Sequence, residues 1–586
     1  MTSISKQLSI LALLSGGLLS FAHAAERPNV VILIGDDVGY SDLGSYGSEI
    51  ETPNLDALAT EGTLFSNYHT TASCSPTRSM VYTGVDTHRN GLGGMYVTMP
   101  EEHRGQPGYE GVLNDKVATL AEMLSNNDYH TYHTGKWHLG SAPEKRPYNR
   151  GYDRTIALGN TGADNWEQRT YLPIDDKAHW YADGEEHRLP DDFYSSKYFV
   201  DKAIEFIDSN HGDGQPFFAS IGFQAVHIPI QAPKEFTEKY LDTYQQGWEV
   251  LREQRRDRAA ALGLIPENAP IATMSTTTKW DDQSELEKEY SSRKMAVYAG
   301  MLDAMDHHVG RLVAHLKTIG EYDNTLFVFI SDNGAEPSDP LAHGSMAAWV
   351  KWNFSVALED LGSKGAYAAI GPSWASAAAS PGGFYKFYAG EGGVRVPMII
   401  SWPSKLAGGK LADSFAHTKD IVPTILEATG TANHNGNFNG KTVEKITGSS
   451  LLPMLSGKAE YTHAADKAIG YELAGNAALY KGQYKLLKNL TPIGDGEWHL
   501  YDISKDPGEV QDLRDDKPER FAEMLADYQQ YAEENGVLPM PNGYEYIAQL
   551  ESNSRAVLLR RWWPKALAWL STLLMLIAVS RRIRSQ

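Results

Sequence analysis

Three short, mainly apolar runs occur along the chain, and each predicts a strand that is buried on both faces. They cover residues 29–35, 217–223 and 325–330. Helical patterns lie between them, for example in the segment that Thr52-Pro53 opens and Gly62 closes. Strands that alternate with helices indicate an α/β fold, in which a mainly parallel sheet carries helices on both faces.

Polar side chains follow each apolar run. They are Asp36-Asp37 after the first run, His227 after the second, and Asp332-Asn333 after the third. Ligands of open α/β sheets bind beyond the carboxyl ends of the strands, so we expect these side chains to meet in one crevice. The three aspartates and the asparagine offer only hard oxygen ligands, which suit Ca²⁺ or Mg²⁺ and disfavour Zn²⁺. Taken separately, each pair is also typical of a turn that caps the next element.

The pattern changes after about residue 440. Short strand patterns broken by glycines run from Ile469 to Leu500 and predict an antiparallel meander. Pro518 then opens a charged helix. The chain of 586 residues is too long for one ordinary core. We therefore predict a main domain over 25–440, a C-terminal α+β subdomain over 441–545 and a tail over 546–586.

The N-terminus predicts export. Lys6 precedes an apolar run from Leu8 to Phe21, and Ala22-His23-Ala24 matches a small-x-small cleavage site. Residues 1–24 are therefore predicted to be a signal peptide, and the mature protein to be periplasmic or otherwise exported.

The tail holds a hydrophobic segment at about 562–580. Trp562, Trp563 and Lys565 precede it, and arginines follow it. If the tryptophans lie in the membrane interface, this segment is long enough to tether the protein to a membrane. A sorting tail that is removed later is the alternative.

Charge and cysteine usage narrow the function. A net charge of -21 argues against nucleic acid as a partner. Cys74 is the only cysteine, so it is a leftover, a reactive thiol or the substrate of a modifying enzyme. Pro76 and Gly84 predict the start and stop of a short helix that places Arg78 on the same face as Cys74. A helix N-terminus beside a guanidinium binds oxyanions well.

Several motifs resemble those of a known family. Cys74-Ser75-Pro76-Thr77-Arg78 resembles the Cys-x-Pro-x-Arg signature of type I sulfatases, in which the cysteine is oxidised to Cα-formylglycine. Gly135-Lys136-Trp137-His138 resembles the second signature, Gly-Lys-x-His. His227-Ile228-Pro229 is similar to the family's His-x-Pro segment. Lys386 precedes residues 391–397, which resemble the family's Glu-Gly-Gly-x-Arg-Val-Pro.

The resemblance extends from residue 27 to about 542 and is closest in pattern to bacterial arylsulfatases. It implies an alkaline-phosphatase-like fold, with residues 25–440 as the catalytic domain, and hydrolysis of small-molecule sulfate esters, chiefly aryl with alkyl as a second class. It also implies a formylglycine-generating maturation enzyme as a partner.

The resemblance further implies roles for individual residues. The hydrated aldehyde derived from Cys74 would attack sulfur. Arg78 and Lys136 would hold the formylglycine, and His138 would contact its second hydroxyl. His227 would protonate the leaving oxygen, and Lys386 would clamp a sulfate oxygen. The implied metal is calcium, with magnesium as the alternative, and its ligands are Asp36, Asp37, Asp332, Asn333 and the modified Cys74. Asp332 is also a candidate base.

Other interpretations stay open at this point. Phosphonate monoester and phosphodiester hydrolases share the fold and ligand set, so theirs are the nearest competing activities. If Cys74 remains a thiol, the protein would be a membrane-anchored anion-binding module. Residues 349–383, rich in alanine and serine, resemble an insertion near the substrate mouth of bacterial arylsulfatases, and a flexible surface loop is the alternative.

Overall fold

The computed structural model describes residues 27–584, so the predicted signal peptide lies outside the described residues. Within that range the largest sheet has ten strands. In spatial order they are β11 (Lys410–Ala412), β2 (Thr63–Phe65), β10 (Met398–Ser401), β9 (Thr325–Ser331), β1 (Asn29–Gly35), β8 (Phe217–Gly222), β4 (His130–Lys136), β5 (Arg154–Leu158), β6 (Trp180–Ala182) and β7 (Glu185–Glu186).

The central strands β9, β1, β8, β4 and β5 are parallel, whereas β10, β6 and β7 pair antiparallel nearer the edges. The three apolar runs of the sequence form β1, β8 and β9, which are neighbours in the sheet. Gly35 of β1 lies opposite Ser331 of β9, and Ile34 lies opposite Gly222 of β8. The carboxyl ends of these strands therefore lie side by side, and the predicted mainly parallel sheet is confirmed.

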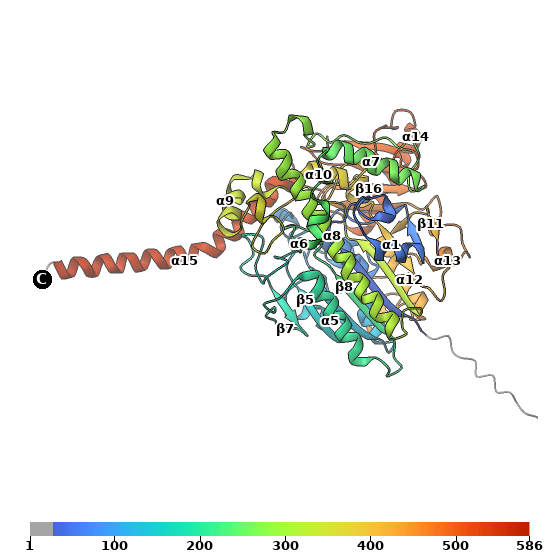
Figure 1. The fold of residues 1–586 in the computed structure, drawn as a ribbon, viewed down its shortest axis with the longest axis horizontal. Helices are drawn as coiled ribbons and strands as arrows, with labels where there is room; N and C mark the ends of the chain where they lie inside the picture. Colours follow the sequence, from blue (N-terminus) through green and yellow to red (C-terminus); the bar gives the residue numbers. More distant parts are fainter. Residues whose placement is uncertain (1–26, 585–586) are drawn as a thin grey trace, which may run out of the picture.

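Helices cover both faces of the sheet (Figure 1). Because successive side chains of a strand point to opposite faces, Val31 and Leu33 of β1 pack in one core, and Val30, Ile32 and Ile34 in the other. The first core includes α1 (Pro53–Thr60), α5 (Ser195–Asn210), α7 (Gly247–Ala261) and α8 (Glu285–Thr318). The second includes α2 (Cys74–Thr83), α4 (Leu120–Ser125) and α12 (Ile421–Thr429).

The segment rich in alanine and serine is a packed part of the fold, which corrects the flexible-loop alternative. It forms α10 (Gly371–Ala378), which packs against α7. Trp374 is 1% exposed, and its ring lies edge-on to those of Trp248 and Trp280. Small side chains allow close packing around this large ring, so the unusual composition reflects burial.

The C-terminal region contains the predicted meander and helix. The antiparallel strands are β15 (Ile469–Leu473), β16 (Asn476–Lys481), β17 (Tyr484–Lys488) and β18 (Trp498–Asp502). One face packs on α14 (Pro518–Asn535) through Leu479, Leu486, Leu500 and Met524. The other face shares a core with Ala72 and Ala389 of the main domain. The exact domain boundaries stay a prediction.

Shorter elements connect these parts. They are β3 (Tyr68–His69), β12 (Ala416–His417), β13 (Asn437–Phe438), β14 (Lys441–Thr442), α3 (Thr87–Asn90), α6 (Lys234–Thr237), α9 (Gly344–Asn353), α11 (Glu391–Val394) and α13 (Leu452–Leu455), together with single 3-10 turns.

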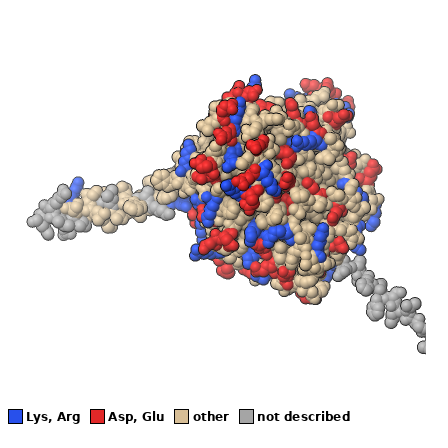
Figure 2. Space-filling model, viewed as in Figure 1, with Lys and Arg blue, Asp and Glu red and all other residues tan. Residues whose placement is uncertain are grey.

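The last helix, α15 (Tyr546–Arg584), projects from the body (Figure 1). Figure 2 shows the described atoms of the projecting part as mostly uncharged. The described side chains beyond Arg561 are exposed, including Trp569 at 79%. Across the part of the chain that the structure describes, no helix is both long enough and apolar enough to cross a membrane, so the span predicted for 562–580 is not found.

Candidate active site

Acidic side chains meet where β1 and β9 end. Asp36 and Asp37 follow β1, and Asp332 follows β9, its parallel neighbour. Carboxylate oxygens of these three residues and Sγ of Cys74 lie within 4.8 Å of one another. Asn333 joins the group, because its Nδ2 donates a hydrogen bond of 2.7 Å to Asp37 Oδ1. The structure thus brings together all the residues predicted to bind a metal.

Cys74 is the first residue of α2, two positions earlier than the predicted start at Pro76. Ser73, in an extended conformation, is the N-cap, and Gly84 ends the helix with a φ of 67°, as predicted. Cys74 Sγ lies 3.3 Å from Asp36 Oδ1 and 3.7 Å from Asp37 Oδ1. The side chain is only 1% exposed. The helix therefore holds Cys74 deep among the carboxylates.

Three buried cations surround this group. Lys136 Nζ lies 2.6 Å from Asp36 Oδ2. Arg78 Nε lies 2.7 Å from Asp332 Oδ2, and its Nη1 donates to the carbonyl oxygen of Lys136. Lys386 Nζ lies 2.8 Å from Asp37 Oδ1. Each predicted cation is thus paired with one of the predicted metal ligands, which fixes its long side chain in place.

The two predicted histidines also lie at the site. His227 Nδ1 lies 2.6 Å from the carbonyl oxygen of Ile228, a contact that requires an N–H donor at Nδ1. Nε2, the other ring nitrogen, lies 3.8 Å from Asp37 Oδ2. Burial and the charges of Lys386 and Lys136 lower the pKa of His227 well below its usual value. Burial, Lys136 and Arg78 act in the same direction on the pKa of His138. Both imidazole rings are therefore neutral until an anionic ligand binds beside them.

The buried carboxylates differ in basicity. Burial raises the pKa of Asp36 to about 6 and that of Asp37 to about 8. Burial acts on Asp332 as well, but Arg78, Lys136 and Lys386 together hold its pKa below the usual value. Asp332 is therefore the weakest base of the three. Burial, reinforced by Asp332, also raises the pKa of the Cys74 thiol well above its ordinary value, so an unmodified Cys74 is a poor nucleophile.

Unpaired polar atoms indicate that the site accommodates further groups. Asn333 Oδ1, Arg78 Nη2 and His138 Nδ1 are buried and have no hydrogen-bond partner. Such atoms are costly unless a ligand or ion satisfies them. An oxygen acceptor among three carboxylates fits a hard divalent cation, and a free guanidinium N–H fits an oxyanion. The residues present therefore fit both groups that the sequence predicts.

Backbone strain is concentrated at the same place. Asp37, His138 and Phe387 have φ angles of 68°, 57° and 80°, in the left-handed region that non-glycine residues rarely adopt. Phe387 directly follows Lys386. Strain of this kind persists where the surrounding structure holds a functional side chain in place.

Sequence reasoning missed one buried acid. Glu336 Oε2 lies 2.7 Å from Lys386 Nζ, and the residue is 4% exposed. Its only signal was its place four residues after Asp332, in the same loop. When all four carboxyl groups are ionised, they exceed the three cations by one negative charge, which a divalent cation would reverse.

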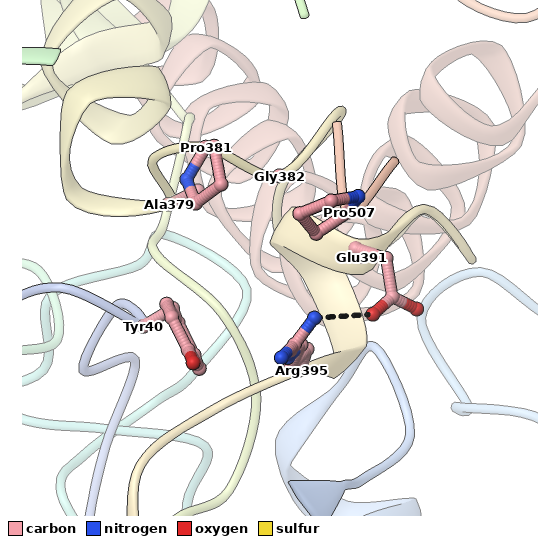
Figure 3. Close-up of a pocket in the computed structure, with 7 residues that line it drawn as sticks. All are labelled: Tyr40, Ala379, Pro381, Gly382, Glu391, Arg395 and Pro507. Carbon is pink, nitrogen blue, oxygen red and sulfur yellow. Dashed lines mark ion pairs between the residues drawn. The ribbon is translucent and has the colours of Figure 1, made fainter. Parts of the chain in front are cut away.

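Arg395 lies away from this chemistry. It donates a 2.7 Å hydrogen bond to the carbonyl oxygen of Ser66, and its guanidinium lies 3.6 Å from Glu391. Figure 3 shows both side chains in a separate pocket, together with Tyr40 and Pro507. Lys485 of the C-terminal sheet also pairs with Glu391. This pocket therefore belongs to the contact between the main domain and the C-terminal sheet.

A parallel sheet that carries hard oxygen ligands, a helix N-terminus and fixed cations at one edge defines an alkaline-phosphatase-like α/β fold. A solved structure of Ps i-CgsB in complex with k-i-k-neocarrahexaose has this fold, with a TM-score of 0.62 at 23% identity, covering 92% of this chain and 98% of its own.

Sequence comparisons identify the family. The sulfatase family model matches residues 28–431, and the model for N-sulphoglucosamine sulphohydrolase, C-terminal, matches 381–534. An uncharacterized sulfatase of Schizosaccharomyces pombe is 38% identical over 90% of this chain and 97% of its own length. An arylsulfatase of Klebsiella aerogenes is 36% identical over 75% of this chain and 94% of its own. The chain belongs to the sulfatase family, and the predicted sulfate ester hydrolase class is confirmed.

Proposed function

We propose that this sulfatase hydrolyses aryl sulfate esters, with alkyl sulfates as slower substrates, through a formylglycine made from Cys74. The observation that carries the proposal is the position of Cys74, at a helix N-terminus among three carboxylates and three cations. A thiol there is held protonated and would serve poorly as a nucleophile. Hydrated formylglycine supplies an oxygen nucleophile that becomes sulfated. Sulfate is then expelled when the second hydroxyl loses its proton and the carbonyl re-forms.

The side chains divide the remaining work. Arg78 and Lys136, already fixed by Asp332 and Asp36, orient the nucleophile. Lys386 offers its charge to a sulfate oxygen, and the bound anionic ester raises the pKa of His227 toward that of a proton donor. His227 then takes up a proton from solvent at Nε2 and gives it to the leaving oxygen as the S–O bond breaks. His138 accepts the proton of the second hydroxyl when sulfate departs.

The leaving group is proposed to be aromatic. Tyr171 lies edge-on to His227, with ring centroids 5.4 Å apart. Tyr171 also belongs to an apolar cluster with Ile228, Phe354 and Tyr367. An apolar, aromatic environment beside the proton donor suits an aryl group. The arylsulfatase name of the Klebsiella relative supports the same choice.

We expect kcat/KM for 4-nitrophenyl sulfate to be at least about 100-fold higher than kcat/KM for 4-nitrophenyl phenylphosphonate. Nitrophenol and inorganic sulfate should be released in equal amounts. Faster turnover of the phosphonate would transfer the assignment to the competing phosphonate monoester activity.

We propose that Asp36, Asp37, Asp332 and Asn333 hold calcium, which neutralises charge and lowers the pKa of a bound hydroxyl. Chelation should abolish turnover, and calcium should restore it better than zinc, because all protein ligands are oxygens. Protons compete for the oxygens of Asp36 and Asp37, so calcium affinity should weaken as pH falls from about 8 through 6. Titration of the chelated protein at pH 8.5 and 5.5, read by intrinsic fluorescence, checks this. Zinc-selective recovery would refute the site.

Maturation and export complete the proposal. Because Cys74 is 1% exposed in the folded chain, a formylglycine-generating enzyme can reach it only before folding closes the site. Export through the predicted signal peptide is compatible with a single cysteine, because a lone cysteine cannot form an internal disulfide in an oxidising compartment.

A further inference from the structure

The first part of α15, residues 546–561, lies on the body in a regular pattern. Its partly or fully buried positions recur every three or four residues, as expected for one face of a docked helix. They are Tyr546, Gln549, Leu550, Asn553, Ser554, Val557, Leu558 and Arg561. We call residues 546–561 the strap. It lies beyond both segments matched by the family models, which end at residues 431 and 534.

Three side chains on this face contact three separate segments. The Tyr546 ring lies against that of Phe387, with centroids 4.8 Å apart. Asn553 Nδ2 donates hydrogen bonds of 3.0 Å to the carbonyl oxygens of Val97 and Met99. Arg561 Nη1 donates to the carbonyl oxygens of Pro173 and Asp175, the latter at 2.8 Å.

Each contacted segment borders a catalytic side chain. Phe387 follows Lys386, and its backbone N–H donates to the carbonyl oxygen of Ala72, two residues before Cys74. Met95, in the loop held by Asn553, accepts a hydrogen bond from Ser73. Residues 173–175, held by Arg561, directly follow the segment of Tyr171, whose ring contacts His227.

The catalytic groups themselves are buried. Cys74, His227 and Lys386 are each at most 3% exposed. An ester must therefore pass between bordering segments, and the strap ties three of these segments to one rigid helix. Tyr546 is itself 7% exposed and close enough to Glu336 and Lys386 for their charges to act on its hydroxyl.

We infer that the strap sets how far the segments bordering the active site can separate, and so decides which leaving groups reach Cys74. Asn553 and Arg561 are positioning residues in this arrangement, because they act through the loops at 95–99 and 171–175. The inference rests on the proposed sulfatase function. A tight strap favours compact aryl esters, and a loosened strap admits bulky ones.

The test uses the full-length protein and the variants Asn553→Ala and Arg561→Ala. Each variant removes the two hydrogen bonds of its side chain. The ratio of kcat/KM for a steroid sulfate to that for 4-nitrophenyl sulfate should then rise by about fivefold, as expected when part of the energy of these bonds held the segments together. Amide hydrogen exchange should accelerate at residues 95–99 in Asn553→Ala and at 171–175 in Arg561→Ala. Arg561→Lys should restore part of the wild-type ratio.

Arg560→Ala is the matched control, since Arg560 is the exposed neighbour of Arg561. It should leave the ratio and the exchange unchanged. An unchanged ratio in both test variants, or an equal change in Arg560→Ala, would overturn the inference. Thermal unfolding of each variant separates loosening from global destabilisation. Because the wild type is assayed on the same esters, its failure to cleave any of them would count against the proposed function instead.

Discussion

Replacing Cys74 with alanine is expected to reduce turnover of 4-nitrophenyl sulfate by at least about 10⁴-fold, as when a covalent nucleophile is removed. The loss should be nearly complete because the neighbouring groups bind and orient but cannot attack sulfur. The fold should persist, since Cys74 contributes a small side chain at the start of α2 and the helix keeps its Ser73 and Gly84 boundaries. Steady-state kinetics with thermal unfolding measures both.

The matched comparison is Cys74→Ser, which keeps a hydroxyl and the size of the side chain. If the aldehyde matters, serine should not restore multiple turnovers, because an ester of a simple alcohol cannot expel sulfate by re-forming a carbonyl. Mass analysis of the wild-type peptide around residue 74 should show the aldehyde in place of the thiol. Activity of the alanine variant above background, or full activity of a wild type that retains its thiol, would exclude the proposed nucleophile.

The second large effect is expected for His227→Ala, and it depends on the leaving group. Alkyl sulfates should lose about 10²- to 10⁴-fold in kcat, because an alkoxide leaves poorly unless it is protonated. 4-Nitrophenyl sulfate should lose far less, since nitrophenolate departs unaided. The comparison of the two substrates at one pH gives the dependence directly.

Lys386→Ala is the control for this prediction. Lys386 offers charge stabilisation that is common to both esters, so its loss should slow them by similar factors. His227 and Lys386 both lie next to Asp37, at 3.8 Å and 2.8 Å from its oxygens, so both variants disturb the same carboxylate. Equal losses on both substrates in His227→Ala would reassign this histidine to holding the sulfate.

Sequence patterns predicted the elements of the fold well where each element is decided locally. The apolar runs of β1, β8 and β9 were recognisable because strands buried on both faces exclude polar residues. The C-terminal meander and α14 followed from regularly placed glycines and Pro518. The start of α2 was placed two residues too late, because Pro76 suits the first turn of a helix but does not have to be its first residue.

The sequence by itself also determined which chemical groups meet at the candidate site, because they come in short motifs, several of them at strand ends. Tertiary structure alone decided which charges pair: Lys136 with Asp36, Arg78 with Asp332, and Lys386 with both Asp37 and Glu336. Those partners lie far apart in the chain, and their pKa values depend on burial and on neighbours that no local pattern encodes.

The same holds for the tail and for the segment of α10. The composition of residues 562–580 resembles that of a membrane span, and that of residues 349–383 fits an insertion near the substrate mouth or a flexible loop. Apolar or small side chains are equally compatible with lipid, solvent exposure or a protein core. Only the packing of Trp374 in the core showed that the α10 segment is part of the folded body, and only the contacts of residues 546–561 showed that α15 begins as a docked helix. The sequence thus determined which groups the protein brings to its chemistry, and long-range packing decided how they are paired, buried and enclosed.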